Sequence, residues 1–158
     1  MSKHPITPAI RVLRGHKVAF TPHLYHYEEK GGTAVSAREL AVPEQQIIKT
    51  LIFEDERKQP LVVLMDGSHQ VSTKTLARLI KVKSITPCDP ASAQKHSGYQ
   101  LGGTSPFGTK KTMPVYMQSG IADLETLYIN GGKRGFLVAI SGTDLVRVLT
   151  PTTLDIAI

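Results

Sequence analysis

The sequence has one cysteine, Cys88, and its six histidines follow no metal-binding spacing such as HExxH. A single cysteine cannot form a disulfide within the chain, and it excludes a zinc site built from several thiolates. Cys88 directly precedes Asp89 and Pro90, a pair typical of a helix start, so we interpret it as a structural thiol. We expect neither a disulfide nor a bound metal.

Long apolar segments and several signature loops are also missing. No run approaches the roughly 20 apolar residues that a membrane-spanning helix needs. The first residues, Met1 to Pro5, lack the apolar core of a secretory signal. The sequence contains no Walker loop, no dinucleotide-binding fingerprint and no GxSxG nucleophile elbow. We therefore expect a cytoplasmic protein that does not bind a membrane.

The composition is that of a folded domain with a basic surface. The 158 residues fit one domain, and 41% hydrophobic with 20% charged residues are sufficient for a core. Nineteen basic residues against thirteen acidic ones leave a formal charge of +6. Such a surplus is compatible with an ordinary basic surface, but it also favours a polyanionic partner such as a nucleic acid.

Capping signals predict a series of short helices. Thr7 can cap a helix that begins at Pro8, and Asp89 with Pro90 repeats this arrangement. Ser36 and Glu39 have the spacing of a capping box. Helices are accordingly expected after Thr7, Ser36, Ser72, Asp89 and Ser141, with a further helical segment at 43–48.

Apolar segments between these helices predict strands at 18–27, 49–53, 61–65, 115–117, 126–129 and 136–140. Pro22 suggests that the first of them is an edge strand. Asn130-Gly131-Gly132 predicts a turn between the last two. Because no regular βαβ repeat is present, the pattern favours the α+β class with a mixed, mostly antiparallel sheet. Residues 101–114 cannot be regular structure, and so long a loop is more often functional than not.

Three features could carry chemistry, although each has a structural alternative. Lys49 stands where a short helix meets an apolar strand, so its ammonium is either solvated or directed into a cleft. The loop from Gly102 to Gly108 is either a structural turn or a backbone that a ligand can approach closely. The segment from Asn130 to Gly135 is either a hairpin with two exposed cations or a phosphate-binding turn.

Taken together, these features occur in an order and spacing that resemble a known family. The shared set comprises Thr7-Pro8-Ala9, Tyr25, Lys49-Thr50-Leu51, Gly98-Tyr99, Gly102 to Gly108, Lys110-Lys111 and Gly131 to Gly135. It resembles the YbaK/EbsC family of Cys-tRNA(Pro) deacylases, relatives of the editing domain in bacterial prolyl-tRNA synthetases. The likeness covers nearly the whole chain, so the expected deacylase domain spans residues 1–158.

The resemblance implies a single α+β domain around a mixed, barrel-like sheet. It implies an enzyme that acts in trans on mischarged Cys-tRNA(Pro), with Cys-tRNA(Cys) as a further candidate substrate. No metal or organic cofactor is implied, and prolyl-tRNA synthetase remains an open possibility as a partner. In this family the cysteine thiol of the substrate is thought to attack its own ester carbonyl, while the protein supplies orientation and backbone donors.

The resemblance also assigns roles to individual residues. Those expected at the reacting ester are Lys49, Gly102 and Gly103. Those expected to bind the substrate are Tyr25, Thr50, Thr104, Ser105, Asn130, Gly131 and Gly132. Those expected to contact tRNA phosphates are Lys110, Lys111, Lys133 and Arg134.

Asn130 departs from the family, which usually has serine at this position. Asparagine is larger, so the pocket could prefer another amino acid. Two alternatives therefore stay open. The chain could be a non-catalytic module that binds tRNA or a synthetase, or it could deacylate another small aminoacyl-tRNA such as Ala-tRNA(Pro).

Overall fold

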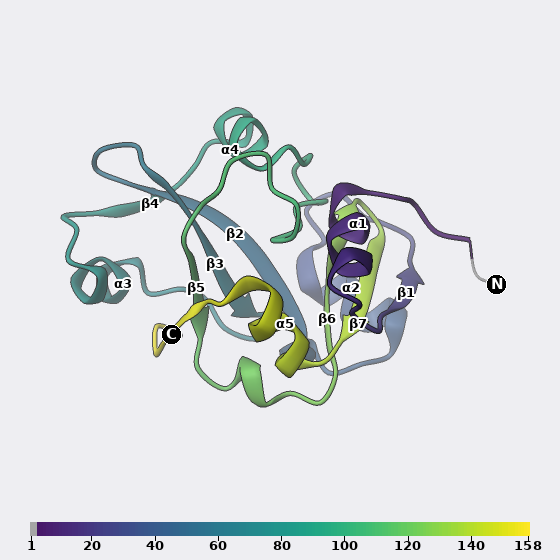
Figure 1. The fold of residues 1–158 in the computed structure, drawn as a ribbon. Helices are drawn as coiled ribbons and strands as arrows, with labels where there is room; N and C mark the ends of the chain where they lie inside the picture. The colour runs from purple at the N-terminus through teal and green to yellow at the C-terminus, as the bar shows by residue number, and fades with distance from the viewer. Residues whose placement is uncertain (1–2) are drawn as a thin grey trace.

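Strands from both halves of the chain form one mixed sheet in the computed structural model, which describes residues 3–158 (Figure 1). The strands are β1 (Thr21–Leu24), β2 (Ile47–Asp55), β3 (Pro60–Asp66), β4 (Ile85–Pro87), β5 (Val115–Gln118), β6 (Leu127–Lys133), β7 (Phe136–Ile140) and β8 (Thr152–Leu154). Their order is β1-β7-β6-β2-β3-β5-β8, and β4 pairs with the far end of β2. The β2–β6, β3–β5 and β5–β8 pairs are parallel, and the others are antiparallel. The predicted α+β class with a mixed sheet is confirmed.

Short helices cover both faces of this sheet. They are α1 (Pro8–Gly15), α2 (Gly32–Leu40), α3 (Thr73–Ile80), α4 (Pro90–Ser97) and α5 (Gly142–Leu149), with 3-10 turns η1 (Glu44–Gln46) and η2 (Ile121–Asp123). The larger core lies under α1 and α5, and the smaller one under α3 (Figure 1). Strand β3 contributes to both, because Val62 and Leu64 point into the larger core while Val63 and Met65 point into the smaller. Burial on both faces explains the unbroken apolar run at 61–65.

The sheet splits where the candidate site lies. The parallel pairing of β2 with β6 is limited to Ile47 with Tyr128 and Ile48 with Ile129. Beyond this point β2 continues through Lys49, paired with β3 on one side and, from Phe53 onward, with β4 on the other, while β6 stays paired with β7. Lys49 is therefore the first residue of β2 beyond its pairing with β6.

Four of the predicted helix starts are confirmed. Side-chain oxygens of Thr7, Ser72, Asp89 and Ser141 each accept a hydrogen bond from the backbone nitrogen three residues later. These bonds satisfy backbone donors that the first helical turn leaves free, which is why the sequence signal was reliable. Gly98 follows α4 in the left-handed conformation, with φ 81°, which is typical of a glycine that ends a helix.

The predicted start of α2 at Ser36 is wrong. The helix begins at Gly32, and Ser36 lies in its middle, where its hydroxyl donates to the carbonyl of Gly32 at 3.3 Å. A turn from Glu28 to Gly31 starts the helix earlier, with the Gly31 nitrogen donating to the Glu28 carbonyl. A Cβ on Gly31 would lie 2.3 Å from Val35, so the missing side chain lets Val35 pack against this turn.

The predicted turn at Asn130-Gly131-Gly132 is also wrong. Strand β6 continues to Lys133, and its register with β7 shifts between Asn130 and Lys133. These residues form a bulge in the strand, with Gly132 at φ 102°, and the reversal follows at Arg134 and Gly135.

The observed bounds of other elements differ from the predicted ones. The strand expected at 18–27 is limited to β1, which is indeed an edge strand, and the helical segment expected at 43–48 is limited to η1. Strands β4 and β8 were not predicted, because each is three residues long and carries no clear alternation. Within residues 3–158, no helix has the length and apolar character to cross a membrane.

Candidate functional site

A cavity of about 430 Å³ occupies the split between β2 and β6. Its volume falls within the range of roughly 300–1,000 Å³ that is common for small-molecule sites. Seven residues expected from the sequence line it: Tyr25, Lys49, Thr50, Gly102, Thr104, Asn130 and Arg134. They come from the end of β1, from β2, from the 101–104 loop and from the β6 bulge with its turn. The fold therefore brings together Lys49 and parts of both glycine-rich segments.

Lys49 is the cationic group on the β2 wall of the cavity. Its ammonium donates a hydrogen bond to the carbonyl of His69, which leaves further donors for a ligand. Burial lowers the pKa of Lys49 below its ordinary value, while the carboxylates of Asp66 and Glu44 act in the opposite direction. Lys49 is thus a partly desolvated cation held in place from one side.

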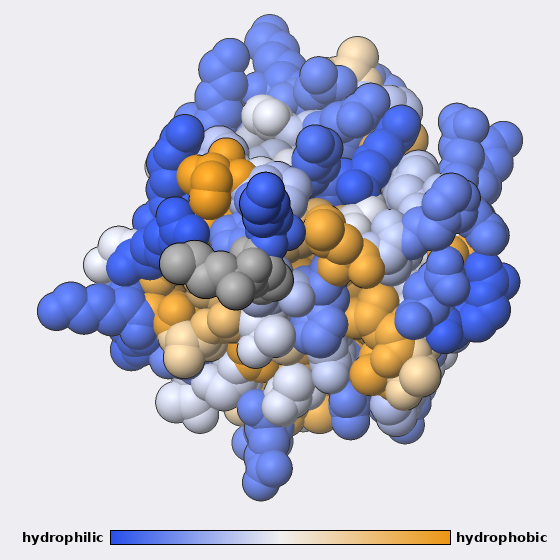
Figure 2. All heavy atoms as spheres, turned by 90° about the vertical axis from the view of Figure 1, so that its right-hand side faces the viewer, coloured by the Kyte–Doolittle hydropathy of each residue, from blue (hydrophilic) through white to orange (hydrophobic). Residues whose placement is uncertain are grey.

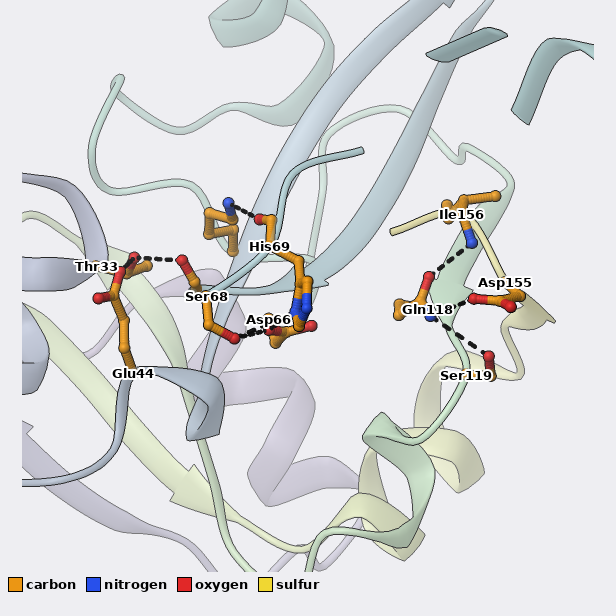
Figure 3. Close-up of polar contacts among 11 residues, drawn as sticks. Thr33, Glu44, Asp66, Ser68, His69, Gln118, Ser119, Asp155 and Ile156 are labelled. Atoms are coloured by element: carbon orange, nitrogen blue, oxygen red, sulfur yellow. Dashed lines mark hydrogen bonds and ion pairs between the residues drawn. The ribbon is translucent and has the colours of Figure 1, made fainter. Parts of the chain in front are cut away.

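The turn after β3 is ordered by its own polar contacts (Figure 3). Asp66 accepts a hydrogen bond from the hydroxyl of Ser68, and its carboxylate lies 2.8 Å from Nδ1 of His69. Burial opposes ionisation of Asp66, but these hydrogen bonds outweigh it and hold the pKa of Asp66 below its ordinary value. Because the carbonyl of His69 receives the ammonium of Lys49, this turn fixes where the ammonium lies.

Hydroxyl groups form much of the remaining polar wall. Burial raises the pKa of Tyr25, with the Ser36 hydroxyl acting against it, so Tyr25 keeps its proton at neutral pH. The Tyr25 nitrogen donates to the carbonyl of Gly135 at 2.9 Å, which anchors Tyr25 beside the β6–β7 turn. The hydroxyl oxygen of Thr50 is buried and has no hydrogen-bond partner within the described part of the chain.

Asn130 joins the two glycine-rich segments. Its Nδ2 donates to the carbonyl of Gly102 at 3.2 Å. Its Oδ1 accepts from the backbone nitrogens of Gly132 at 2.6 Å and Lys133 at 3.1 Å. One side chain therefore both stabilises the bulge and holds the 101–104 loop against it.

Arg134 adds a second link between these segments. Its Nε donates to the carbonyl of Leu101 at 2.7 Å, and its guanidinium carbon lies 5.1 Å from the centre of the Tyr27 ring. A Cβ on Gly103 would lie 2.8 Å from the Arg134 nitrogen, so the loop can approach the turn this closely only without a side chain. Gly103 is buried and does not line the cavity.

Three further residues expected to contact the substrate lie outside the cavity. Ser105 is fully buried, and its hydroxyl accepts from the nitrogen of Phe107. Gly131 packs under the ring of Phe136, and Gly132 packs against Tyr99 and Thr7. Close packing accounts for these glycines, and the structure gives no support to the expectation that they touch the substrate.

The lysines expected at tRNA phosphates are spread over the surface. Lys110 and Lys111 follow the 101–108 loop and are exposed, with their backbone nitrogens bonded to Ser97 and His96. Lys133 is exposed on the β6–β7 turn beside the cavity without lining it. Only Arg134 of this group is part of the cavity wall.

Sequence reasoning missed several residues of the wall. Glu28 and Glu29 were not singled out, yet both line the cavity, and Glu28 pairs with Arg38 at 2.8 Å. Tyr27 was also missed, although its alternation with Tyr25 along the chain was a usable signal. The apolar part of the wall comprises Val35, Ile47, Ile48, Leu51, Leu101 and Leu137.

No cysteine or histidine is among the described residues that line this cavity. Cys88 lies at the other end of β2, where its thiol contacts Glu54, and burial followed by that carboxylate raises the pKa of Cys88 to about 11. Residues 3–158 contain no group of three or more His, Cys, Asp or Glu side chains arranged to hold a metal ion. The cavity thus offers cations, carboxylates, hydroxyls, an amide and backbone groups to a ligand.

Solved structures share this fold over nearly the whole chain. A crystal structure of the hypothetical protein APE2540 superposes with a TM-score of 0.87, covering 96% of this chain and 100% of that one at 18% identity. Another structure, named provisionally as a trans-editing enzyme for prolyl-tRNA synthetase, gives a TM-score of 0.80 and covers 98% and 99% of the two chains at 17% identity.

Sequence relatives agree with this likeness. The chain is 27% identical over 136 residues to a protein of Enterococcus faecalis named provisionally as the Cys-tRNA(Pro)/Cys-tRNA(Cys) deacylase EbsC, covering 85% of this chain and 83% of that protein. It is 23% identical over 138 residues to a proline–tRNA ligase of Streptococcus thermophilus, covering 86% of this chain and only 21% of the ligase. The model of the aminoacyl-tRNA editing domain matches residues 28–148. The resemblance seen in the sequence is therefore confirmed, and the chain belongs to the family of aminoacyl-tRNA editing domains.

Proposed function

We propose that this chain is a trans-editing deacylase that removes cysteine from Cys-tRNA(Pro), with Cys-tRNA(Cys) as a second substrate. The observation that carries the proposal is the cavity in the split sheet, which Lys49 of β2 lines together with Gly102 of the 101–104 loop and Asn130 of the β6 bulge. The family acts on aminoacyl-tRNA, and the similarity to the Enterococcus faecalis protein supports this amino acid. The site of action would be the cytoplasm, where prolyl-tRNA synthetase could supply the mischarged tRNA.

In this proposal the cavity holds the terminal adenosine and its aminoacyl ester. Lys49 keeps donors free beside its bond to His69, and these suit a ribose hydroxyl or the ester oxygen. Gly102 is exposed on the loop, so its backbone can lie close to the ester, whereas Gly103 acts by letting this loop pack on the β6–β7 turn. Tyr25, Thr50 and Thr104 shape the space for the amino acid.

The chemistry then needs no nucleophile from the protein. The cysteine thiol of the substrate attacks its own ester carbonyl, so a carbon–sulfur bond forms as the carbon–oxygen bond to the ribose breaks. The thiol proton is transferred to the departing ribose oxygen. The products are free tRNA and a cyclic thiolactone, which water hydrolyses. The protein contributes by orienting the reacting groups and stabilising the developing oxyanion.

This route also explains how cysteine can be distinguished from other small amino acids. A pocket alone separates side chains that differ by one or two atoms only weakly. A thiol is a far better nucleophile than the hydroxyl of serine, and alanine has no nucleophile at all. Selection would therefore depend on the reactivity of the substrate as much as on the shape of the cavity.

The test compares three charged forms of one tRNA. Wild-type protein is incubated with Cys-, Ser- and Ala-tRNA(Pro), and ester loss is followed above the uncatalysed rate, with trapping of the thiolactone. We expect rapid loss of cysteine and little loss of serine or alanine. Equal cleavage of all three would refute the thiol-dependent route and indicate a hydrolytic enzyme, for which Glu29 in the cavity wall could activate water. Tight tRNA binding without any cleavage would refute enzymatic activity.

A further inference from the structure

A second hollow, of about 420 Å³, adjoins the cavity on the side of the N-terminal segment and β1. Its lining residues are Lys3, His4, Pro5, Leu24, Lys133 and Arg134. Arg134 also lines the first cavity, so the two spaces meet at this side chain. Figure 2 looks onto this side of the molecule, where apolar surface lies between hydrophilic side chains.

The hollow is strongly basic. Lys3, Lys133 and Arg134 give it three positive charges, and none of its lining residues within 3–158 is acidic. None of these three takes part in the ion pairs found among residues 3–158. The guanidinium of Arg134 is held by its bond to the Leu101 carbonyl and by the Tyr27 ring, so it is oriented before any ligand binds. A preorganised guanidinium suits a phosphate group.

The hollow also contains an exposed apolar side chain. Leu24, at the end of the edge strand β1, is 61% exposed. The ring of His4 lies nearly parallel to that of Phe136, 5.7 Å away, so it is fixed in the wall. Proteins that bind single-stranded nucleic acids combine a basic groove that follows the backbone with aromatic side chains on which the bases stack. In this hollow the exposed side chain available to a base is that of Leu24.

We propose that this hollow binds the single-stranded nucleotides that precede the terminal nucleotide at the 3′ end of tRNA. The proposal rests on the proposed function, because the terminal nucleotide must occupy the first cavity. The strand would pass Arg134, whose guanidinium lies between the two spaces and would contact the phosphate that links them. Lys3 and Lys133 would contact the next phosphates, and Leu24 would cover the face of a base.

The test measures binding of a short single-stranded RNA ending in CCA by fluorescence anisotropy at several salt concentrations. The test variant is Lys3→Ala/Lys133→Ala, which leaves Arg134 and the first cavity intact. The matched control is Lys74→Ala/Lys83→Ala, which removes the same charge from a region at α3, far from both spaces (Figure 1). A blunt RNA hairpin without an overhang serves as the control ligand.

We expect the test variant to bind the CCA RNA more weakly than wild type, with the control variant unchanged. Each phosphate contact on a single strand contributes about 0.7 to the slope of log affinity against log salt. Two lost contacts therefore reduce the slope by about 1.4, so wild type should lose about sevenfold more affinity than the test variant between roughly 50 and 200 mM salt.

Three results would overturn the inference: equal binding by all three proteins, equal weakening in the control variant, or equal binding of the blunt hairpin by wild type. A failure of the proposed function has a different signature. In that case wild type leaves Cys-tRNA(Pro) intact, whether or not the CCA RNA distinguishes the variants.

Discussion

Replacing Asn130 should loosen the two glycine-rich segments that meet at the cavity. Its side chain makes three hydrogen bonds, of 3.2 Å to Gly102, 2.6 Å to Gly132 and 3.1 Å to Lys133. A hydrogen bond within a protein contributes about 0.5–1.5 kcal/mol to stability. Because Asn130 is only partly buried, water replaces some of this, and the lower part of that range applies. Asn130→Ala should then reduce the free energy of unfolding by about 2 kcal/mol.

Two further variants divide this loss between the bulge and the loop. Asn130→Ser keeps a short acceptor for the bulge but cannot reach the carbonyl of Gly102, so it should lose about 1 kcal/mol. Asn130→Asp keeps an oxygen that accepts from both bulge nitrogens and places its second carboxylate oxygen opposite the Gly102 carbonyl. The bulge should tolerate Asn130→Asp, but two oxygens facing each other repel, so the 101–104 loop should be released. Activity should therefore fall more than stability.

Thermal unfolding measures the loss of stability, and the rate of Cys-tRNA(Pro) cleavage measures the loss of activity. For a chain of this size, a loss of about 2 kcal/mol lowers Tm by about 4–8 °C. We expect Asn130→Ala to show this shift and all three variants to lose kcat/KM. If Asn130→Ala matches wild type in both Tm and kcat/KM, the role assigned to its hydrogen bonds is refuted.

Three other perturbations test separate parts of the structure. Burial lowers the pKa of Lys49, and the carboxylate of Asp66 raises it, so activity should fall as the pH rises through the pKa of Lys49. Asp66→Asn removes the carboxylate and should move this fall to lower pH. An unchanged rate–pH profile would contradict the role assigned to the Lys49 ammonium. Gly103→Ala would place a Cβ 2.8 Å from the backbone of the β6–β7 turn and should reduce the free energy of unfolding, measured with denaturant, by about 1–3 kcal/mol. In the control, Gly15→Ala, the added Cβ meets no atom within 4 Å, so the free energy of unfolding should rise slightly. Cys88, whose pKa is raised to about 11 by partial burial and by Glu54, should be replaceable by serine without loss of deacylation, and a clear loss would contradict its structural assignment.

Signals that act within one helical turn were predictable from the sequence. Thr7, Ser72 and Asp89 cap helices because their side chains satisfy donors three residues away, so no distant contact is needed. Ser36 has the same spacing to Glu39 but lies in the middle of α2, since Gly31 and its packing against Val35 start the helix earlier. The misplaced turn at Asn130 has a similar cause, because its side chain bonds hold a strand bulge that the glycines alone do not reveal.

The candidate site was predictable in part for the same reason. The likeness to a family indicated Lys49, Tyr25 and Gly102, but it did not distinguish residues that line the cavity from those that pack behind it. Gly131 and Gly132 are examples, since their missing side chains make room for Phe136, Tyr99 and Thr7. That distinction depends on contacts between distant parts of the chain, which spacing along the sequence does not contain.

The central claim is that Lys49 promotes the removal of cysteine from Cys-tRNA(Pro). Its most direct test is single-turnover cleavage of this substrate by wild type and by Lys49→Ala, with Lys74→Ala as a control that removes the same charge elsewhere. Wild type and the control should cleave the ester well above the uncatalysed rate. Lys49→Ala should remain folded, as judged by circular dichroism, and should lose about 100-fold or more in rate, as is typical when an electrostatic contact to the reacting group is removed. Cleavage by folded Lys49→Ala at the wild-type rate would contradict the account.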